Sequence, residues 1–139
     1  MNDAVTTSIV RFFRAVDTRD WDTVHALLAD EVTLDYVSVF GGEPETIASD
    51  EVVKRWQGLL PGFDATQHLL GTLAEIDGAV QGNVRGYHVL GDEVWMVAGW
   101  YHLSIRPADP PRIAGILLTA SYETGSRDLI ARAQARAAG

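Results

Sequence analysis

The stretch Ala65-Thr66-Gln67-His68-Leu69-Leu70 marks the point at which this chain changes from helical to strand periodicity. It places one histidine in an alternating run without charged neighbours, a pattern typical of a β-strand. Short turn sequences, Asp77-Gly78 and Gly91-Asp92, then separate further runs of strand character, which favours antiparallel hairpins. The second half of the chain is therefore predicted to be a meander of four long strands, at residues 65–76, 79–90, 93–105 and 111–123.

Helical periodicity dominates the residues that precede this stretch. Apolar side chains recur at helical spacing from residue 4 to residue 17, which predicts a first helix. Asp20 is suited to cap a second helix that ends at Asp30-Glu31, and Ser49 is suited to cap a third that Pro61-Gly62 stops. One strand is expected between these helices, from residue 32 to residue 40, and a short helix is expected at the end of the chain, from residue 127 to residue 138.

This order of elements predicts an α+β fold in a single domain, residues 1–139. Helices come first and an antiparallel meander follows, so the helices are expected to cover one face of the sheet. Glycines within the strands, such as Gly86 and Gly99, indicate bends that would curve the sheet. A curved sheet wrapped over helices gives a cone-shaped α+β barrel, and its open mouth is a natural pocket for a small hydrophobic molecule.

Composition and charge exclude several classes of function. The formal net charge of −8 opposes binding to phosphate backbones and anionic lipids, so we expect no nucleic-acid or membrane partner. The chain has no cysteine, which excludes thiolate chemistry and cysteine-based zinc sites. No glycine run has phosphate-cradling spacing, and we expect no cofactor. The absence of cysteine, together with a start that lacks a secretory pattern, predicts a cytoplasmic location.

His68 is the candidate acid–base residue. An imidazole is a side chain suited to transfer a proton, although a strand histidine beside leucines can equally be a hydrogen-bonded core residue. Asp17 lies one residue past the apolar helical stripe, so it either points inward or belongs to a polar turn. Tyr36 shares strand parity with Leu34, which directs its side chain into the cone as a core residue or as a substrate contact.

Two further patterns concern metals and oligomers. His68, His88 and His102 lie on neighbouring expected strands, but their spacing does not match a metal motif, and we expect no metal site. Trp100 and Tyr101 point to opposite faces of a strand that is apolar at both parities. A sheet with two apolar faces needs a second cover, so we expect a homo-oligomer, a dimer or a trimer.

Three segments of the chain together resemble a known family. They are Asp17-Thr18-Arg19-Asp20-Trp21-Asp22, then Leu34-Asp35-Tyr36, and then Thr66-Gln67-His68, which Gly86-Tyr87-His88 follows one hairpin later. Their order and spacing resemble the nuclear transport factor 2-like (NTF2-like) superfamily across nearly the whole chain. Within it, the chain is similar to the SnoaL-like branch that includes scytalone dehydratase. The resemblance implies the NTF2-like, or cystatin-like, form of the cone-shaped fold.

The resemblance also implies roles for individual residues. In scytalone dehydratase-like enzymes the histidine of the third segment is an acid–base group, which an aspartate at the helix junction orients. These roles are thereby implied for His68 and Asp17, and Tyr36 is implied to bind a substrate carbonyl through water. We add Trp56, His88 and Trp100 as candidate substrate-binding residues.

The function expected from these residues is that of a cofactor-free lyase or isomerase, similar to a dehydratase, acting on a small apolar hydroxy-carbonyl or polyketide-like molecule. The chain departs from the family pattern at three places. Val16 stands where a tyrosine is expected, and Trp100 stands where an asparagine is expected. The hairpin turn Gly91-Asp92 is short, whereas the family has a second histidine on a longer hairpin. These departures keep open a domain of the same fold that binds ligands or oligomerises without chemistry. An epoxide hydrolase-like function is a weaker alternative, since Arg85 has the opposite strand parity to His88.

Overall fold

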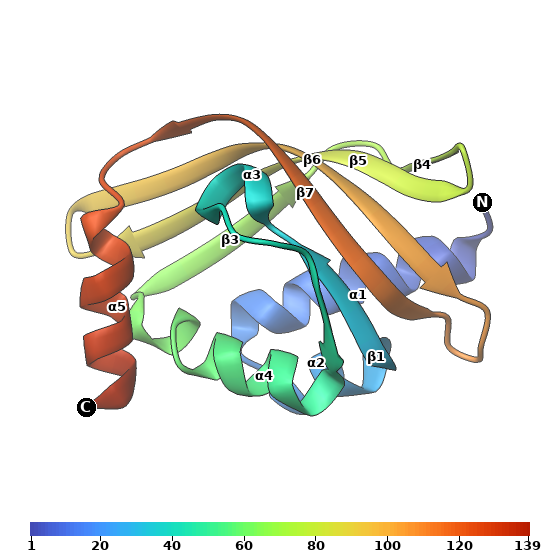
Figure 1. The fold of residues 1–139 in the computed structure, drawn as a ribbon, viewed down its shortest axis with the longest axis horizontal. Helices are drawn as coiled ribbons and strands as arrows, with labels where there is room; N and C mark the ends of the chain where they lie inside the picture. Colours follow the sequence, from blue (N-terminus) through green and yellow to red (C-terminus); the bar gives the residue numbers. More distant parts are fainter.

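The computed structural model describes residues 1–139, which form one curved, unclosed sheet with helices packed on its inner face (Figure 1). The helices are α1 (Asp3–Thr18), α2 (Trp21–Leu27), α3 (Val37–Phe40), α4 (Ser49–Gln57), the 3-10 turn η1 (Leu60–Gly62) and α5 (Asp128–Ala138). The strands are β1 (Leu28–Asp35), β2 (Glu45–Ala48), β3 (Ala65–Leu70), β4 (Ala74–Ile76), β5 (Ala79–Leu90), β6 (Glu93–Arg106) and β7 (Arg112–Thr124). The predicted α+β architecture, with N-terminal helices on a curved sheet, is confirmed.

The strand order in the sheet is β2-β1-β7-β6-β5-β3, and β4 pairs with the first three residues of β5. The pairs β3–β5, β5–β6 and β6–β7 are antiparallel, as the short turns predict, whereas β1 pairs with β7 in parallel. The register of β6 against β7 shifts at Ala98/Gly99 and again at Ser104/Ile105. Such bulges bend and twist the strands, which gives the sheet the curvature that encloses a pocket. At Gly99 a Cβ would lie 2.0 Å from the Thr119 carbonyl oxygen, so only glycine fits this bend.

Helix α1 supplies much of the core beneath the sheet. Its apolar stripe, Ile9, Phe12, Phe13 and Val16, is buried, as the helical spacing predicts. The second helix begins as predicted, because the Asp20 side chain accepts a hydrogen bond from the Thr23 backbone N–H at 3.2 Å. Helix α1 packs against β3, and Asp17 lies in the last turn of the helix. None of the helices combines the length and the apolarity required to cross a membrane.

The predicted strand at residues 32–40 is wrong in its second half. The strand begins earlier, at Leu28, and ends at Asp35, and the β-branched residues after Tyr36 form the short helix α3. The Ser38 hydroxyl donates to the Leu118 carbonyl at 2.7 Å and accepts from the Ala120 N–H at 2.9 Å, which ties α3 to β7. This contact across the fold outweighs the local strand propensity.

Two further local predictions need correction. The expected strand at residues 65–76 divides into β3 and β4, because Leu70 and Ala74 are four residues apart while their partners Val84 and Gln81 are only three apart. The extra residue cannot join the ladder. Ser49 does not cap α4, since the helix begins at Ser49 itself and the cap residue, Ala48, makes no side-chain hydrogen bond.

Candidate active site

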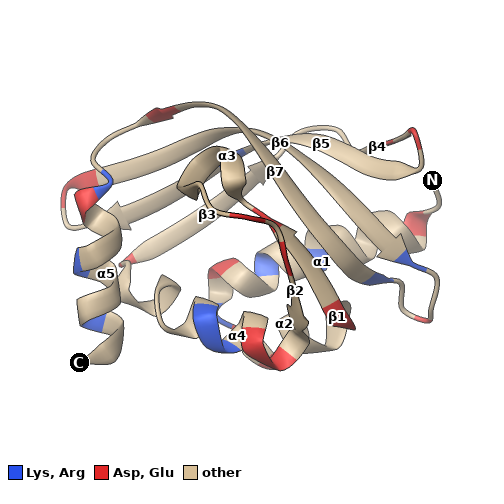
Figure 2. Ribbon diagram, in the orientation of Figure 1, with Lys and Arg blue, Asp and Glu red and all other residues tan.

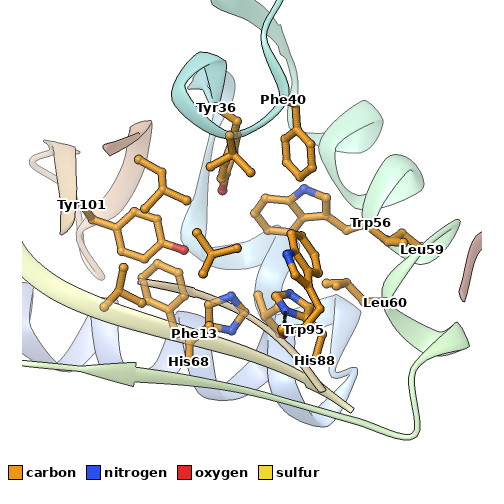
Figure 3. Close-up of a pocket in the computed structure, with 16 residues that line it drawn as sticks. Phe13, Tyr36, Phe40, Trp56, Leu59, Leu60, His68, His88, Trp95 and Tyr101 are labelled. Atoms are coloured by element: carbon orange, nitrogen blue, oxygen red, sulfur yellow. Dashed lines mark hydrogen bonds between the residues drawn. The ribbon is translucent and has the colours of Figure 1, made fainter. Parts of the chain in front are cut away.

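A pocket opens between the inner face of the sheet and the segment from α3 to η1 (Figure 3). Its volume is about 150 Å³, and no lysine or arginine lines it. Aromatic side chains make up much of the wall, among them Phe13, Phe40, Trp56, Trp95 and Tyr101. Trp56, a predicted substrate-binding residue, therefore lies in the wall. A concave, largely apolar wall with few polar groups is typical of a site for a small, uncharged ligand.

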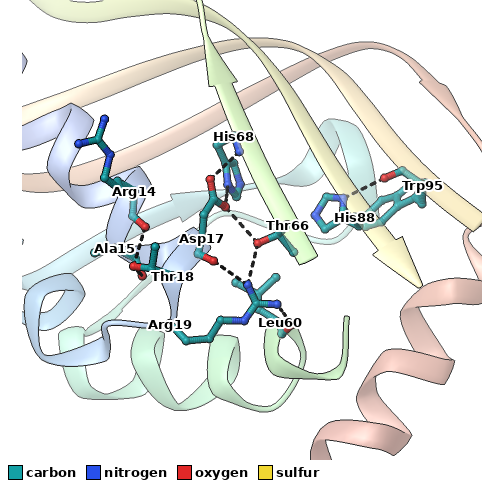
Figure 4. A network of polar contacts seen from close by, with 10 residues as sticks. All are labelled: Arg14, Ala15, Asp17, Thr18, Arg19, Leu60, Thr66, His68, His88 and Trp95. Carbon is teal, nitrogen blue, oxygen red and sulfur yellow. Dashed lines mark hydrogen bonds and ion pairs between the residues drawn. The ribbon is translucent and has the colours of Figure 1, made fainter. Parts of the chain in front are cut away.

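His68 and Asp17 meet at one side of this pocket. The His68 Nδ1 atom lies 2.8 Å from Asp17 Oδ1, and the His68 backbone N–H donates to Asp17 Oδ2 at 2.7 Å (Figure 4). The side chains are only 13% and 15% exposed. The sequence places these residues 51 positions apart, and the docking of α1 on β3 brings them together. The same histidine lines the pocket, so the dyad faces the ligand space.

The hydrogen bonds determine the state of the dyad. Burial alone would raise the pKa of Asp17, but the hydrogen bonds and charge of His68, with the Thr66 hydroxyl, hold that pKa below its usual value. Asp17 is therefore an ionised acceptor at neutral pH. Because a carboxylate can only accept, the neutral His68 ring carries its proton on Nδ1 and leaves a lone pair on Nε2. An imidazole in this tautomer, held by a carboxylate, is suited to act as a general base.

A second imidazole, that of His88, lines the same pocket, and its ring centre lies 6.4 Å from that of His68. His88 is 8% exposed, stacks on Trp95 with a centroid distance of 4.4 Å, and has its Nδ1 atom 3.1 Å from the Trp95 carbonyl oxygen. Burial, and then repulsion from His68, lowers the pKa of His88 to about 4. The ring is thus neutral at pH 7, donates from Nδ1 to the carbonyl, and keeps Nε2 as an acceptor. The pocket holds two imidazoles although the hairpin after β5 is short.

Two tyrosine hydroxyls point into the other side of the pocket, those of Tyr36 and Tyr101 (Figure 3). Burial raises the pKa of each phenol above its usual value, so both stay protonated at neutral pH. The ring of Tyr101 stacks on that of Phe13, with a centroid distance of 4.9 Å, and the centroid of the Phe13 ring lies 5.4 Å from that of the His68 ring. Donors from the tyrosines and acceptors from the histidines therefore share one apolar space. Sequence analysis missed Tyr101 as a site residue.

Trp100, a predicted substrate-binding residue, does not line this pocket. Strand parity correctly places Trp100 and Tyr101 on opposite faces, but Tyr101 is the residue that enters the pocket. Trp100 is 37% exposed on the outer face of β6, where its Nε1 atom donates to His102 Nε2 at 2.9 Å. His102 consequently lies apart from the two histidines of the pocket. Parity separates the two faces of a strand, but it does not say which face packs on the helices.

Comparison with known proteins gives the chain a family. A family model described as the SnoaL-like domain matches residues 2–109. The chain belongs to the SnoaL-like family. The predicted resemblance is thereby confirmed, and the match spans the segments that carry Asp17, Tyr36, His68 and His88. No curated protein matches the sequence.

Several solved structures have the same fold as this SnoaL-like protein. The Kfla4162 protein of Kribbella flavida is 25% identical, with a TM-score of 0.79 over 97% of this chain and 95% of that one. A provisionally assigned scytalone dehydratase of Novosphingobium aromaticivorans is 16% identical, with a TM-score of 0.74 over 89% and 86% of the two chains. A provisionally assigned ketosteroid isomerase of Kribbella flavida is 18% identical, with a TM-score of 0.62 over 86% and 79%. The latter two likenesses establish the shared fold alone.

Proposed function

We propose that this SnoaL-like protein is a cofactor-independent lyase or isomerase that acts on a small, neutral, largely apolar hydroxy-carbonyl compound. The observation that carries the proposal is the His68–Asp17 dyad, which opens on an apolar pocket with its Nε2 lone pair available. The structural likeness to proteins described as a scytalone dehydratase and a ketosteroid isomerase agrees with it. Chemistry of both kinds begins with the removal of a proton beside a carbonyl group.

The proton transfer follows from the dyad. His68 Nε2 takes a proton from the carbon next to the substrate carbonyl, and the imidazolium that forms lies against the ionised Asp17. Asp17 keeps its charge throughout, holds the ring in one orientation and stabilises the imidazolium. In a dehydration, His68 then gives this proton to the departing hydroxyl group, which leaves as water. In an isomerisation the proton returns to a different carbon.

The tyrosine pair supplies the second requirement, a donor for the carbonyl oxygen. Negative charge develops on this oxygen as the proton leaves carbon. Tyr36 and Tyr101 are protonated and point into the pocket, so either hydroxyl can donate to that oxygen directly or through water. His88 supplies the third requirement: its Nε2 acceptor is suited to hold the hydroxyl group of the substrate. The set thus matches a compound with one carbonyl acceptor and one hydroxyl donor.

Pocket size and charge restrict the substrate further. A cavity of about 150 Å³ is similar to one known to hold a benzene ring, so the enclosed part accommodates one ring and a longer molecule extends to the mouth. Carboxylates and phosphates find no cationic partner in the wall. An epoxide-opening site with an arginine lacks support, because Arg85 is exposed and does not line the pocket.

The proposal is tested with a panel of neutral β-hydroxy ketones in D₂O. We expect deuterium to enter the carbon next to the carbonyl, and enone to form from the best substrates, as followed by NMR and ultraviolet absorbance. One-ring analogues that fit wholly inside the pocket and carry a carboxylate on the ring serve as matched controls and should not react, because no cationic side chain lines the wall. Tight binding of the neutral compounds without exchange would instead favour a ligand-binding protein without chemistry.

We also propose that a second copy of the chain covers the outer face of the sheet. Leu69, Trp100 and Tyr122 are exposed there, along a groove that contains Arg85 but no carboxylate. Strands β6 and β7 carry charges only near their ends (Figure 2). A chain of net charge −8 repels its own copies over most of its surface. Electrostatic repulsion between two copies is therefore weakest where an apolar face without carboxylates meets its counterpart.

Replacement of Trp100 tests this interface. We expect the protein to sediment at twice the 15.2 kDa mass of the chain, and Trp100→Arg to sediment at the mass of a single chain, because a charge would be buried without a partner. The matched control is Val10→Arg on α1, which introduces the same charge at a residue that is 38% exposed and does not line the groove. A parent protein that sediments as a monomer at high concentration would contradict the proposal.

A further inference from the structure

Arg19 has a backbone conformation that an arginine rarely adopts. It has φ 58° and ψ 31°, in the left-handed region, at the point where α1 ends. Its N–H bonds to the Val16 carbonyl, and the Asp20 N–H bonds to the Ala15 carbonyl, which is the turn that usually places glycine at this position. A Cβ makes the left-handed conformation unfavourable. Such an outlier persists where the surrounding structure holds it, and here the side chain supplies the holding contacts.

The guanidinium of Arg19 joins three segments around the pocket (Figure 4). One nitrogen, Nη1, donates to the Asp17 carbonyl at 2.8 Å and to the Thr66 hydroxyl oxygen at 3.2 Å. The other, Nη2, donates to the Leu60 carbonyl at 2.7 Å and to the Phe63 carbonyl at 3.3 Å. The side chain therefore fastens the end of α1 to the start of β3 and to η1, whose Leu60 lines the pocket.

The contact between Arg19 and Thr66 determines which atom donates in each hydrogen bond between Arg19, Thr66 and Asp17. A guanidinium can only donate, so the Thr66 hydroxyl accepts from Arg19 and uses its own proton elsewhere. That proton goes to Asp17 Oδ1, which lies 3.0 Å away and is also the atom that faces His68 Nδ1. The chain of donors thus runs from Arg19 through Thr66 to Asp17, where it meets the Nδ1–H donor of His68. Each bond orients the next one.

From these contacts we infer that Arg19 is a positioning residue that acts through Thr66 and Asp17 to hold the His68 ring with Nδ1 protonated and Nε2 directed to the pocket. The sequence motifs assign no role to this arginine. The inference deepens the proposed function, because it names what keeps the general base in its reactive tautomer. It also stands apart from that function, since the tautomer of His68 can be observed without a substrate.

The test is nitrogen-15 NMR of the histidine rings, which distinguishes the two tautomers. In the parent protein we expect the Nδ1–H form of His68 and a downfield Nδ1–H proton. In Arg19→Gly, which relieves the backbone conformation and removes the side chain, we expect that proton signal to be lost by exchange and the two nitrogen shifts to converge. Arg19→Lys should behave similarly, because one ammonium nitrogen cannot occupy the positions of both guanidinium nitrogens.

Two matched variants separate positioning from stability and from charge. Thr66→Val keeps the bonds of Arg19 to the three carbonyl groups but breaks the link to Asp17, so it should reproduce the spectral change, whereas Thr66→Ser should restore the parent spectrum. Arg14→Ala removes an arginine that is exposed on α1 and points away from Asp17, and it should change nothing in the His68 spectrum (Figure 4).

The outcomes are separable. If Arg19→Gly and Thr66→Val both fold and retain the parent His68 signals, the inference is wrong, whatever their thermal stability. If Arg19→Gly does not fold, Arg19→Lys and Thr66→Val decide the question by the same signals. On a substrate that the parent turns over, we expect kcat to fall about tenfold to a hundredfold in Arg19→Gly with little change in KM. A tautomer that shifts as expected, with no turnover of any hydroxy ketone, would refute the proposed function but not the positioning role.

Discussion

Replacement of His68 by alanine is expected to lower kcat/KM on a responsive β-hydroxy ketone by about 10³-fold, since general base catalysis contributes about 10²–10⁴-fold. The reason lies in the geometry: His68 is the only base in the pocket that a carboxylate supports, through the 2.8 Å contact with Asp17. His88 cannot substitute for it at pH 7, because burial lowers the pKa of that ring to about 4 and makes it a weak base. The measurement is deuterium incorporation and enone formation under the conditions used for the parent.

Controls for this prediction are available within the chain. His68→Gln keeps a polar side chain of similar length without a titratable ring, so it should lose as much activity as His68→Ala does. His25→Ala removes a half-exposed histidine on α2 that pairs with Asp50 and does not line the pocket, and it should keep the parent activity. If both His68 variants turn over the substrate at the parent rate, the acid–base assignment is refuted.

Acidification is expected to reduce the free energy of unfolding by about 3 kcal/mol in total through His88 alone. The folded protein holds the pKa of His88 at about 4, against 6.5 for a free imidazole. The unfolded chain therefore binds the proton more readily, and stability falls as the pH drops from about 6.5 to about 4. Well above pH 6.5 the ring is neutral in both the folded and the unfolded state, so His88 no longer makes stability depend on pH. Urea unfolding at closely spaced pH values measures the effect.

The groups that face His88 set the limits of this pH window. The charge of His68 disfavours protonation of His88, and Asp17 favours it. Asp17 itself has a lowered pKa, so its own stabilising contribution is lost only as the pH falls below its unfolded value of 3.8, outside the window of His88. His88→Phe retains an aromatic ring against Trp95 and removes the titration. Its stability should consequently vary much less than that of the parent between pH 6.5 and pH 4, and an unchanged slope would refute the assignment to His88.

Local pattern was sufficient to predict several of the helices and hairpins and the fold class. The helical stripe of α1, the Asp20 cap and the hairpin turns at Asp77-Gly78 and Gly91-Asp92 each depend on neighbours within a few residues, which the sequence shows directly. The order of helices and strands then predicted the α+β class. The family resemblance, carried by three short segments, selected Asp17, Tyr36 and His68 as candidates. The structure places Tyr36 and His68 in the wall of one pocket, with Asp17 hydrogen-bonded to His68.

Tertiary structure alone decided how the site is completed. Strand parity showed that Trp100 and Tyr101 face opposite ways, but only the docking of the helices decides that Tyr101 lies inside. The tautomer of His88 follows from a carbonyl on the neighbouring strand, and α3 replaces a strand because Ser38 bonds across the fold to β7. Arg19 gains its role from Thr66, 47 residues away. These features depend on contacts between residues far apart in the chain, and periodicity and local propensity contain no information about such contacts.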